Sequence, residues 1–362
     1  MGPSRSLLAS ARAMDYRVRF PPNVGILLSS KPIHLSVLEE LVHTLPPQLH
    51  LIGAKVANVF VNPSVSNCER DGSKPAPKGA QNNDFGITLG AFPEAEVSSF
   101  AIHDPGRASE TSLRRAFFEK RRVEMLGKSS EASETASTAQ LEERYAHLHE
   151  LDHQLSAEWA ALSRVEKLAY AESRPWEDQL AAADAATAPD AKVFIVLSTA
   201  RGAHFLDAFL RRLQSMHPAA AIVGGIVSSG AGCVLASRQV VRRVDSGVAC
   251  LAFRGNVPLT ALICREEKSH MQEKLTQVKT HMEASGQELL GTAMFTCTAR
   301  DGTDDLKSLL SVFGGQPVLG MAAGGEIGPR YKRGRPSAQT GDVELQGFTC
   351  VCGLFVVPRR MQ

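Results

Sequence analysis

Three residues in the last quarter of the chain have side chains that could act together on a ligand. Arg300 can hold a carboxylate through two parallel hydrogen bonds, and Glu326 can accept hydrogen bonds from an ammonium group. Cys297 carries a thiol, which needs a neighbouring base before it can act as a nucleophile. An arginine and a carboxylate that face one cleft would suit a free amino acid or the end of a peptide.

Small residues surround the carboxylate of this set. Residues 320–329 read GMAAGGEIGP, so Glu326 lies among closely spaced glycines. Glycine lets the backbone come close to another strand or to a ligand. We therefore predict a ligand-binding site made of Cys297, Arg300, Gly324, Gly325, Glu326 and Gly328.

Two other interpretations of these side chains stay open at the level of the sequence. Arg300 and Glu326 could pair with each other, or Glu326 could cap local backbone N–H groups. No histidine lies near Cys297 in the sequence, so this thiol lacks an evident base. We therefore expect no catalytic residue, and we predict recognition in place of catalysis.

An α/β unit is needed to position these residues. Leu306, Leu309, Leu310 and Phe313 recur at helical spacing, and Thr303 is the expected N-cap of that helix. An apolar run that ends at Gly320 follows the helix. A right-handed crossover would bring the ends of the two strands beside this helix to one edge of a sheet, where ligands often bind in open α/β sheets.

The same order of helix, glycine-containing strand and further strands occurs twice upstream. The two copies begin with helices near residues 36–45 and 205–213, and their strands reach Gly53 and Gly224. Residues 86–92 and 247–253 then align glycine to glycine and phenylalanine to phenylalanine. We expect each of these strands to return as a hairpin, over 97–103 and 259–264. The sequence therefore predicts repeated α/β units that form mixed sheets with flanking helices.

Two further helical regions lie outside this pattern. Residues 107–190 are rich in Glu, Ala, Arg and Ser, and their apolar residues, Leu155 and Trp159 among them, recur at helical spacing. We predict a helical, partly low-complexity insertion there. A separate helix is expected over 268–284, where Met271, Leu275, Val278 and Met282 form an apolar stripe.

Composition excludes several classes of partner and cofactor. With 40 basic and 38 acidic residues the net charge is +2, which gives no reason to expect nucleic acid as a partner. The seven cysteines form no CxxC pairs, so neither a disulfide framework nor a metal site is expected, and an intracellular protein is indicated. No P-loop and no complete dinucleotide-binding motif is present, so we expect no cofactor. No apolar run is long enough to cross a membrane, so we expect no membrane partner.

Two segments resemble the FIST family, the sensory modules named after F-box and intracellular signal transduction proteins. Residues 319–329, LGMAAGGEIGP, are similar to a signature near the end of the family's C-terminal domain, and residues 294–300, MFTCTAR, are similar to its strand that ends in Cys-x-x-Arg. Residues 246–253 and the glycines at 224–225 also fit. The resemblance covers most of the chain outside 107–190. It implies FIST N- and C-terminal domains, and it divides the chain into an N-terminal extension (1–22), the first part of the N-terminal domain (23–106), the insertion and linker (107–190), a second α/β unit (191–265) and the C-terminal domain (266–362).

The resemblance also implies a function. The FIST part of the F-box members that this chain most resembles in layout recognises proteins destined for ubiquitination. The resemblance therefore implies a protein-binding role linked to ubiquitin-dependent turnover or signalling, with a protein substrate or Skp1/cullin-type machinery as partners. Bacterial members suggest the alternative of an intracellular sensor that binds a small metabolite such as an amino acid. The first expected strand, residues 24–28, leaves too little sequence ahead of it for an F-box. The expected localisation is cytoplasmic, with the nucleus as the alternative.

Overall fold

The chain is described by a computed structural model and divides into two compact units. Residues Met1–His103 and Glu177–Gln362 belong to the larger unit, and Asp104–Trp176 form the smaller one. The described residues are 21–32, 35–62, 81–83, 85–104, 190–227, 232–265, 268–330 and 342–359, together with 113–114, 117–118, 120–121, 138–163, 166–167 and 175–183. No helix within these ranges is both long enough and apolar enough to cross a membrane.

The smaller unit is built around one long helix. Helix α4 (Thr138–Ala161) contributes Leu151, Leu155 and Trp159 to a buried cluster that also contains Leu113 and Phe117. The predicted helix in this region is therefore present. The stretch expected as an insertion, 107–190, also includes helix α6 (Trp176–Ala182), which lies mostly in the larger unit.

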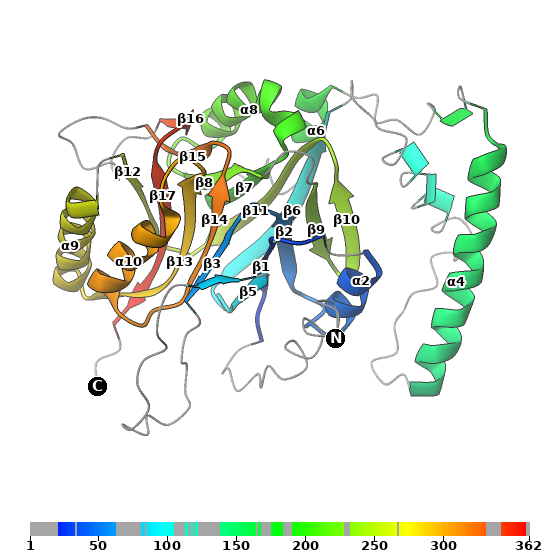
Figure 1. Cartoon of the computed structure of the whole chain (residues 1–362), viewed down its shortest axis with the longest axis horizontal. Helices are drawn as coiled ribbons and strands as arrows, with labels where there is room; N and C mark the ends of the chain where they lie inside the picture. The colour runs from blue at the N-terminus through cyan, green and yellow to red at the C-terminus, as the bar shows by residue number, and fades with distance from the viewer. Residues whose placement is uncertain are drawn as a thin grey trace. The chain divides into compact units, whose positions relative to one another are not determined.

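Three mixed sheets make up the larger unit, and the predicted α/β fold is confirmed (Figure 1). The first sheet has the order β10 (Val240–Val244), β9 (Cys233–Ser237), β2 (His50–Lys55), β1 (Val24–Ser29), β5 (Phe85–Gly90). The second has the order β16 (Val343–Gln346), β15 (Glu326–Pro329), β8 (Ala221–Ile226), β7 (Ala191–Ser198), β11 (Gly247–Gly255), β6 (Ala95–His103). The third has the order β12 (Leu259–Cys264), β17 (Cys350–Pro358), β13 (Gln287–Cys297), β14 (Val318–Ala323), β3 (Val59–Asn62), β4 (Gln81–Asn83).

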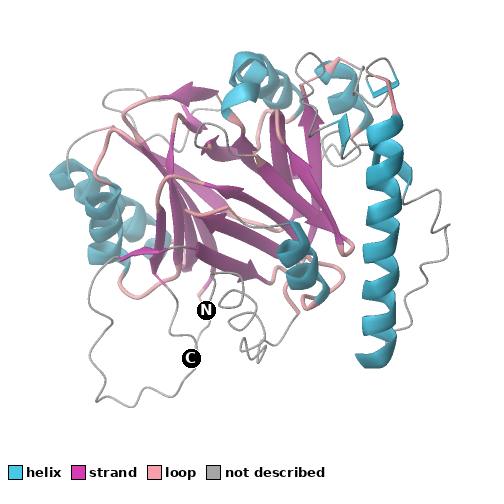
Figure 2. Cartoon of the chain, turned by 45° about the vertical axis from the view of Figure 1, so that its right-hand side comes forward, coloured by secondary structure: helices cyan, strands magenta, loops and turns pink. Residues whose placement is uncertain are grey.

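Each sheet contains one parallel strand pair joined by a helix. The pairs are β1 with β2, β7 with β8, and β13 with β14. The connecting helices are α2 (Leu35–His43), α8 (Ala203–Met216) and α10 (Gly302–Phe313), and each buries one apolar stripe. Helix α9 (Lys268–Ala284) packs beside α10, with the predicted residues Met271, Leu275 and Met282 buried. The helices α2, α8, α9 and α10 of the larger unit lie around the outside of its sheets (Figure 2).

The three βαβ units are copies of one pattern, which we call the first repeat (24–103), second repeat (191–264) and third repeat (287–358). In each repeat the strand pair is followed by a hairpin, and that hairpin joins the sheet of another repeat. Strands β3 and β4 of the first repeat join the third sheet, β9 and β10 of the second join the first sheet, and β15 and β16 of the third join the second sheet. The exchange is cyclic, so no repeat completes its own sheet.

The predicted hairpins at 86–103 and 247–264 are wrong. Strand β5 pairs with β1, whereas β6 pairs with β11 in the second sheet. In the same way β11 pairs with β7, whereas β12 pairs with β17 in the third sheet. The short turns between these strands carry the chain from one sheet to the next. Alternating strands joined by a short turn are typical of a hairpin, so the sequence pattern alone does not separate the two outcomes.

One hydrophobic core joins all three sheets. It contains residues from every repeat, including Leu28, Ile195 and Phe295 on the first strands of the three βαβ units. Three phenylalanines, one from each repeat, contact one another in this region. The ring centroids of Phe92 and Phe253 are 5.8 Å apart, those of Phe92 and Phe355 5.5 Å, and those of Phe253 and Phe355 6.0 Å. The repeats therefore share one interior.

A glycine occupies the same ladder position in the second parallel strand of each repeat. Gly53, Gly224 and Gly320 pair with Leu27, Val196 and Met294 respectively. A Cβ atom at any of the three would crowd the backbone of its partner, including the carbonyl oxygen. The sequence identified these glycines but expected them at strand ends, whereas the structure places them inside the strands. Close approach of the neighbouring backbone is the physical reason for a glycine at such a position.

Candidate functional site

The ends of β13, β15 and β17 lie together and carry the polar residues that the sequence identified. Arg300 follows β13 and binds Asp305 on α10 through both ends of its guanidinium group. Its Nε lies 3.0 Å from Oδ2 and its Nη2 lies 2.7 Å from Oδ1 of the Asp305 carboxylate. The predicted bidentate grip on a carboxylate therefore exists, but an internal carboxylate occupies it. This hydrogen bonding raises the pKa of Arg300 above its ordinary value.

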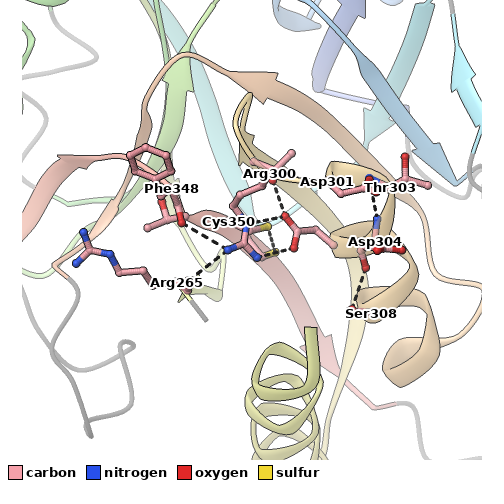
Figure 3. Close-up of polar contacts among 12 residues, drawn as sticks. Arg265, Arg300, Asp301, Thr303, Asp304, Ser308, Phe348 and Cys350 are labelled. Atoms are coloured by element: carbon pink, nitrogen blue, oxygen red, sulfur yellow. Dashed lines mark hydrogen bonds and ion pairs between the residues drawn. The ribbon is translucent and has the colours of Figure 1, made fainter. Parts of the chain in front are cut away.

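Arg300 also holds two loops together through their backbone. Its Nη1 donates to the carbonyl oxygens of Arg265 (3.3 Å) and Phe348 (3.5 Å). On the other side of the pair, the hydroxyl of Thr296 donates to Oδ2 of Asp305 at 2.5 Å. Figure 3 shows the guanidinium group reaching these partners, with the Phe348 ring pointing away from it. The arginine therefore joins β13, α10 and the turn before β17.

The turn after β13 also starts helix α10, and the predicted cap of that helix is wrong. Asp301, not Thr303, is the N-cap: its side chain accepts hydrogen bonds from the backbone N–H groups of Thr303 (2.9 Å) and Asp304 (3.3 Å). Asp301 has the extended backbone that an N-cap requires. Both residue types cap helices well, and the choice between them depends on where the crossover places the first helical turn.

Glu326 is the first residue of β15 and has no exposed surface. Its Oε2 accepts hydrogen bonds from the hydroxyl (2.7 Å) and the backbone N–H (3.2 Å) of Thr349. Within the described ranges no hydrogen-bond donor is aligned with its Oε1. Glu326 therefore accepts from a backbone N–H group, as the capping interpretation expects, but that group lies in the turn before β17 and is not local in sequence. No ion pair links Glu326 to Arg300 in the part of the chain that the structure describes.

The ladder positions show that this carboxylate is a special feature of the third repeat. Glu326 pairs with Gly225, the residue that follows Gly224 on β8. The residues in the same position on the other exchanged hairpins are Cys233, which pairs with Ala54, and Val59, which pairs with Met321. Both are wholly buried. Of these three equivalent interior positions, one therefore carries a carboxyl group (Glu326), whereas the other two carry a thiol (Cys233) and an aliphatic side chain (Val59).

Burial shifts the pKa of Glu326. Removal from water raises the pKa of its carboxyl above the ordinary value of 4.5. The two hydrogen bonds from Thr349, the thiol of Cys297 and the positive charge of Arg300 act in the opposite direction. Because burial is the largest of these influences, the carboxyl keeps its proton to a higher pH in the folded chain than an exposed glutamate does.

Cys297 is buried and acts mainly through its backbone. Its N–H donates to the carbonyl oxygen of Thr349 (2.9 Å), and its carbonyl oxygen accepts from the N–H of Arg300 (2.9 Å). The thiols of Cys350 and Cys352, on the neighbouring strand, are free and share a hydrogen bond, with their sulfur atoms 3.8 Å apart. The contact with Cys352 and burial together raise the pKa of Cys350 well above its ordinary value. The thiol of Cys350 is therefore held in its neutral form.

The three predicted glycines lie where the chain passes from the third sheet to the second. Gly324 donates its N–H to the carbonyl oxygen of Ile226, and Gly325 accepts from the N–H of the same residue, both at 2.9 Å. A Cβ at Gly328 would lie 2.9 Å from the methyl groups of Val351 on the third sheet. The glycines thus allow close packing of protein against protein, which is one of the two roles that the sequence left open for them.

The turn before β17 is a part of the site that the sequence analysis missed. Strand β17 begins at Cys350, and Phe348 lies in the preceding turn. Phe348 has a φ of 60°, in the left-handed region, and 68% of its surface is exposed. Its carbonyl oxygen is held by Arg300, and the next residue, Thr349, is held by Glu326. The apolar character of Phe348 favours a strand and hides this role, so no sequence signal marks it.

The structure thus brings Cys297, Arg300 and Glu326 into one network of polar contacts around Thr349. A groove of about 840 Å³ lies elsewhere, between α8 and β16, and none of the predicted site residues lines it. Within the described ranges, no group of three or more His, Cys, Asp or Glu residues is arranged to hold a metal ion. The network instead fixes the backbone of a turn that displays an aromatic ring.

Comparison with known proteins adds no assignment. No protein-family model matches the chain, and the search of curated proteins finds no match.

Proposed function

We propose that this chain is a non-enzymatic recognition module that binds another protein through the turn at Phe348. We propose further that the module is of the FIST type and acts in ubiquitin-linked protein turnover, as the resemblance of residues 319–329 and 294–300 implies. Such a role places the protein in the cytoplasm, with the nucleus as the alternative. Two residues of the resembling segments form hydrogen bonds with the backbone of this turn: Arg300 with the carbonyl oxygen of Phe348, and Glu326 with the N–H of Thr349.

The conformation and exposure of Phe348 carry the proposal. A bulky residue in the left-handed region costs about 1–2 kcal/mol, and such strain persists where a function demands it. The aromatic ring is exposed, so it contributes little to the core in return. Aromatic side chains, phenylalanine among them, are enriched in protein interfaces relative to the rest of the surface. The buried Arg300–Asp305 pair supplies the fixed backbone.

Comparison of the proteins recovered with matched variants tests this proposal. Tagged wild-type chain, Phe348→Ala and Val240→Ala are expressed in cells and purified under the same conditions. Val240 is the matched control, because it is another exposed apolar residue, 54% exposed, on the edge strand β10. We expect a protein substrate together with Skp1 and a cullin among the proteins retained by the wild type, and at least a tenfold loss of the substrate with Phe348→Ala. The Val240→Ala variant should behave as wild type.

Two results would contradict the proposal in different ways. Equal recovery of all partners with Phe348→Ala would remove the binding role of the turn. Recovery of a turn-dependent partner without Skp1 or a cullin would leave the recognition role and remove the link to ubiquitination. A Cys297→Ser variant that loses an enzymatic activity of the wild-type chain would contradict the non-enzymatic part.

A second candidate function is an intracellular sensor for a small metabolite such as an amino acid. The observation that favours it is the buried Oε1 of Glu326, which has no aligned donor and could accept a hydrogen bond from an ammonium group. A thermal-shift screen of the twenty common amino acids tests it. A shift with the wild-type chain that disappears in Glu326→Gln would favour the sensor, and no shift with any amino acid would reject it.

A further inference from the structure

Among the residues that the structure describes, one sheet edge lacks the covering strand that the other two sheets have at the equivalent position. In the second sheet, β6 covers the outer edge of β11, and in the third sheet, β12 covers the outer edge of β17. Strand β5 holds the equivalent position in the first sheet, because it pairs with β1 as β11 pairs with β7 and as β17 pairs with β13. No strand pairs with the outer edge of β5 within the described ranges.

The backbone groups on that edge follow from the ladder register. The N–H of Val56 donates to the carbonyl oxygen of Ser29, so Ser29 and Leu27 direct their backbone groups to β2, and Ile26 directs its groups to Thr88 on β5. Successive residues of a strand direct their backbone groups to opposite sides. The N–H and C=O groups of Ile87 and Leu89 therefore point away from β1, along the outer edge of the first sheet.

The residues of β5 are more exposed than those of its counterparts, β11 and β17, as expected for a strand whose outer edge is not covered. Ile87, Thr88 and Leu89 are only half-buried. The residues at the same ladder positions, Cys250, Leu251 and Ala252 on β11 and Cys352 and Leu354 on β17, have no exposed surface. The neighbouring core residue Ile26 is also half-buried, whereas its counterpart Ile195 on β7 has no exposed surface. The first sheet is therefore less covered on this side than the other two.

The residues of β5 do not protect the edge against pairing. Its sequence, FGITLG, contains neither a charged residue nor a proline, the two devices that commonly block strand addition. At the other edge of the same sheet, β10 carries Arg242 and Arg243. The two edges of the first sheet thus differ in whether their residues oppose strand addition.

We propose that the outer edge of β5 binds an extended segment of a partner protein as a sixth, antiparallel strand of the first sheet. The proposal deepens the recognition role and rests on it, and it names the binding mode as strand addition. The strands that cover the equivalent edges define the chemistry of the segment. Both β6 (AEVSSFAIH) and β12 (LTALIC) run antiparallel to their partners and are dominated by small, apolar and hydroxyl side chains. The partner segment should have five or six such residues and no proline.

Hydrogen exchange on a full-length chain with a tethered strand tests this proposal. A copy of residues 95–103 is joined after Gln362 through a long flexible glycine–serine linker, which gives the strand a high effective concentration at the edge. The matched control carries the same copy with prolines in place of its residues corresponding to Val97 and Ser99. We expect the amides of Ile87 and Leu89 to exchange at least about tenfold more slowly in the tethered chain than in the control. The amides of Cys250 and Cys352 serve as the internal reference and should not differ.

Two results would overturn the proposal. Equal exchange of the Ile87 and Leu89 amides in both fusions would show that the edge does not accept a strand. Slow exchange of the same amides in the unmodified chain would show that another segment of the chain, or a second copy, already covers the edge; dilution separates these two, because only protection by a second copy falls with concentration. The measurement uses the chain alone, so its failure is distinct from a failure of the Phe348 variants to lose a partner.

Discussion

At the scale of single residues, the Arg300–Asp305 pair shows that a side chain predicted to bind a ligand can instead stabilise the fold. The arginine side chain is 15% exposed and the aspartate 5%. A charge at such a depth needs its partner, because removal of one member leaves the other buried and uncompensated. The same pair fixes the carbonyl group of Phe348. The chemistry inferred from the residue type was suitable for a carboxylate, and the carboxylate is supplied by α10.

The first prediction concerns this pair. Arg300→Ala should lower the free energy of unfolding by about 3 kcal/mol, because it leaves the Asp305 carboxylate buried without a cation. The double variant Arg300→Ala, Asp305→Ala should lose less than the sum of the two single variants, with a coupling of about 2 kcal/mol in chemical denaturation. Lys307→Ala is the matched control, since Lys307 pairs with Asp304 but is 55% exposed. Additive losses would refute the coupling.

The second prediction follows from the raised pKa of Glu326. The folded chain holds a proton on this carboxyl that the unfolded chain releases above about pH 4.5. The stability that this group contributes is therefore present below that pH and is lost as pH rises towards the folded pKa. Glutamine does not titrate, so Glu326→Gln should gain stability relative to the wild type as the pH is raised, by about 1.4 kcal/mol for each unit of pKa shift.

Urea denaturation of both proteins between about pH 4 and pH 8 measures this difference. Thr349→Val supplies a control, because it removes a hydroxyl that favours the ionised carboxyl. The pH dependence of the Thr349→Val chain should be steeper than that of the wild type. A difference between wild type and Glu326→Gln that stays constant over this range would show that the carboxyl has the same pKa in both states.

At the scale of elements, the three glycines on the second parallel strands form a graded series. The clash that a methyl group would meet is closest at Gly224, where it faces the carbonyl oxygen of Val196. At Gly53 it would lie 2.5 Å from the carbonyl oxygen of Leu27, and at Gly320 it would lie 3.0 Å from that of Met294. Backbone atoms of a central strand cannot move aside as the end of a side chain can.

The third prediction ranks alanine substitutions at these sites. Gly224→Ala should lose more than about 3 kcal/mol, Gly53→Ala an intermediate amount and Gly320→Ala about 1 kcal/mol. Gly315→Ala is the control, because no atom lies within 4 Å of the added carbon. Thermal or urea denaturation gives the order. If Gly320→Ala were the most damaging of the three, the geometric explanation of the series would fail.

The elements themselves could largely be predicted from the sequence, but their sheet partners could not. Helical spacing identified α8, α9 and α10, because a stripe of apolar residues repeats with the period of the helix. Strand pairing depends on side chains that meet only in the folded chain. The turns after β5 and β11 look like hairpin turns, yet each leads into a different sheet.

The candidate site could be predicted only in part, because its residues also have partners that lie far apart in the sequence. Residue type suggested Arg300 and Glu326, and the structure places both at the ends of β13 and β15. Their partners, Asp305 and Thr349, come from separate elements, and local spacing does not identify them. The positive φ of Phe348 has no counterpart in the residue pattern, because phenylalanine seldom adopts it.

At the scale of the whole molecule, the three repeats depend on one another through the shared core. Phe253 has no exposed surface and contacts a phenylalanine from each of the other two repeats. Because each sheet also contains a hairpin from another repeat, loss of packing in one sheet removes support from the next. The larger unit should therefore unfold as one cooperative body.

The fourth prediction tests this dependence. Phe253→Ala should lower the free energy of unfolding by about 3–5 kcal/mol. The loss should also be global: amide exchange in β1, β7 and β13 should accelerate by the same factor, although only β7 belongs to the repeat that carries the substitution. Acceleration confined to β7 and β11 would contradict a shared core. Val240→Ala, at an exposed position on the edge of the first sheet, should leave all three strands unchanged.

The cyclic exchange of hairpins has a consequence for synthesis on the ribosome. Strand β2 is made early, yet the strand that covers its free side, β9, begins only at Cys233, roughly two-thirds of the way along the 362 residues. The nascent chain therefore emerges with an apolar strand side open while more than a hundred further residues are added. The speed of translation over residues 56–233 then determines how long the unpaired edge of β2 is accessible to chaperones or to other nascent chains.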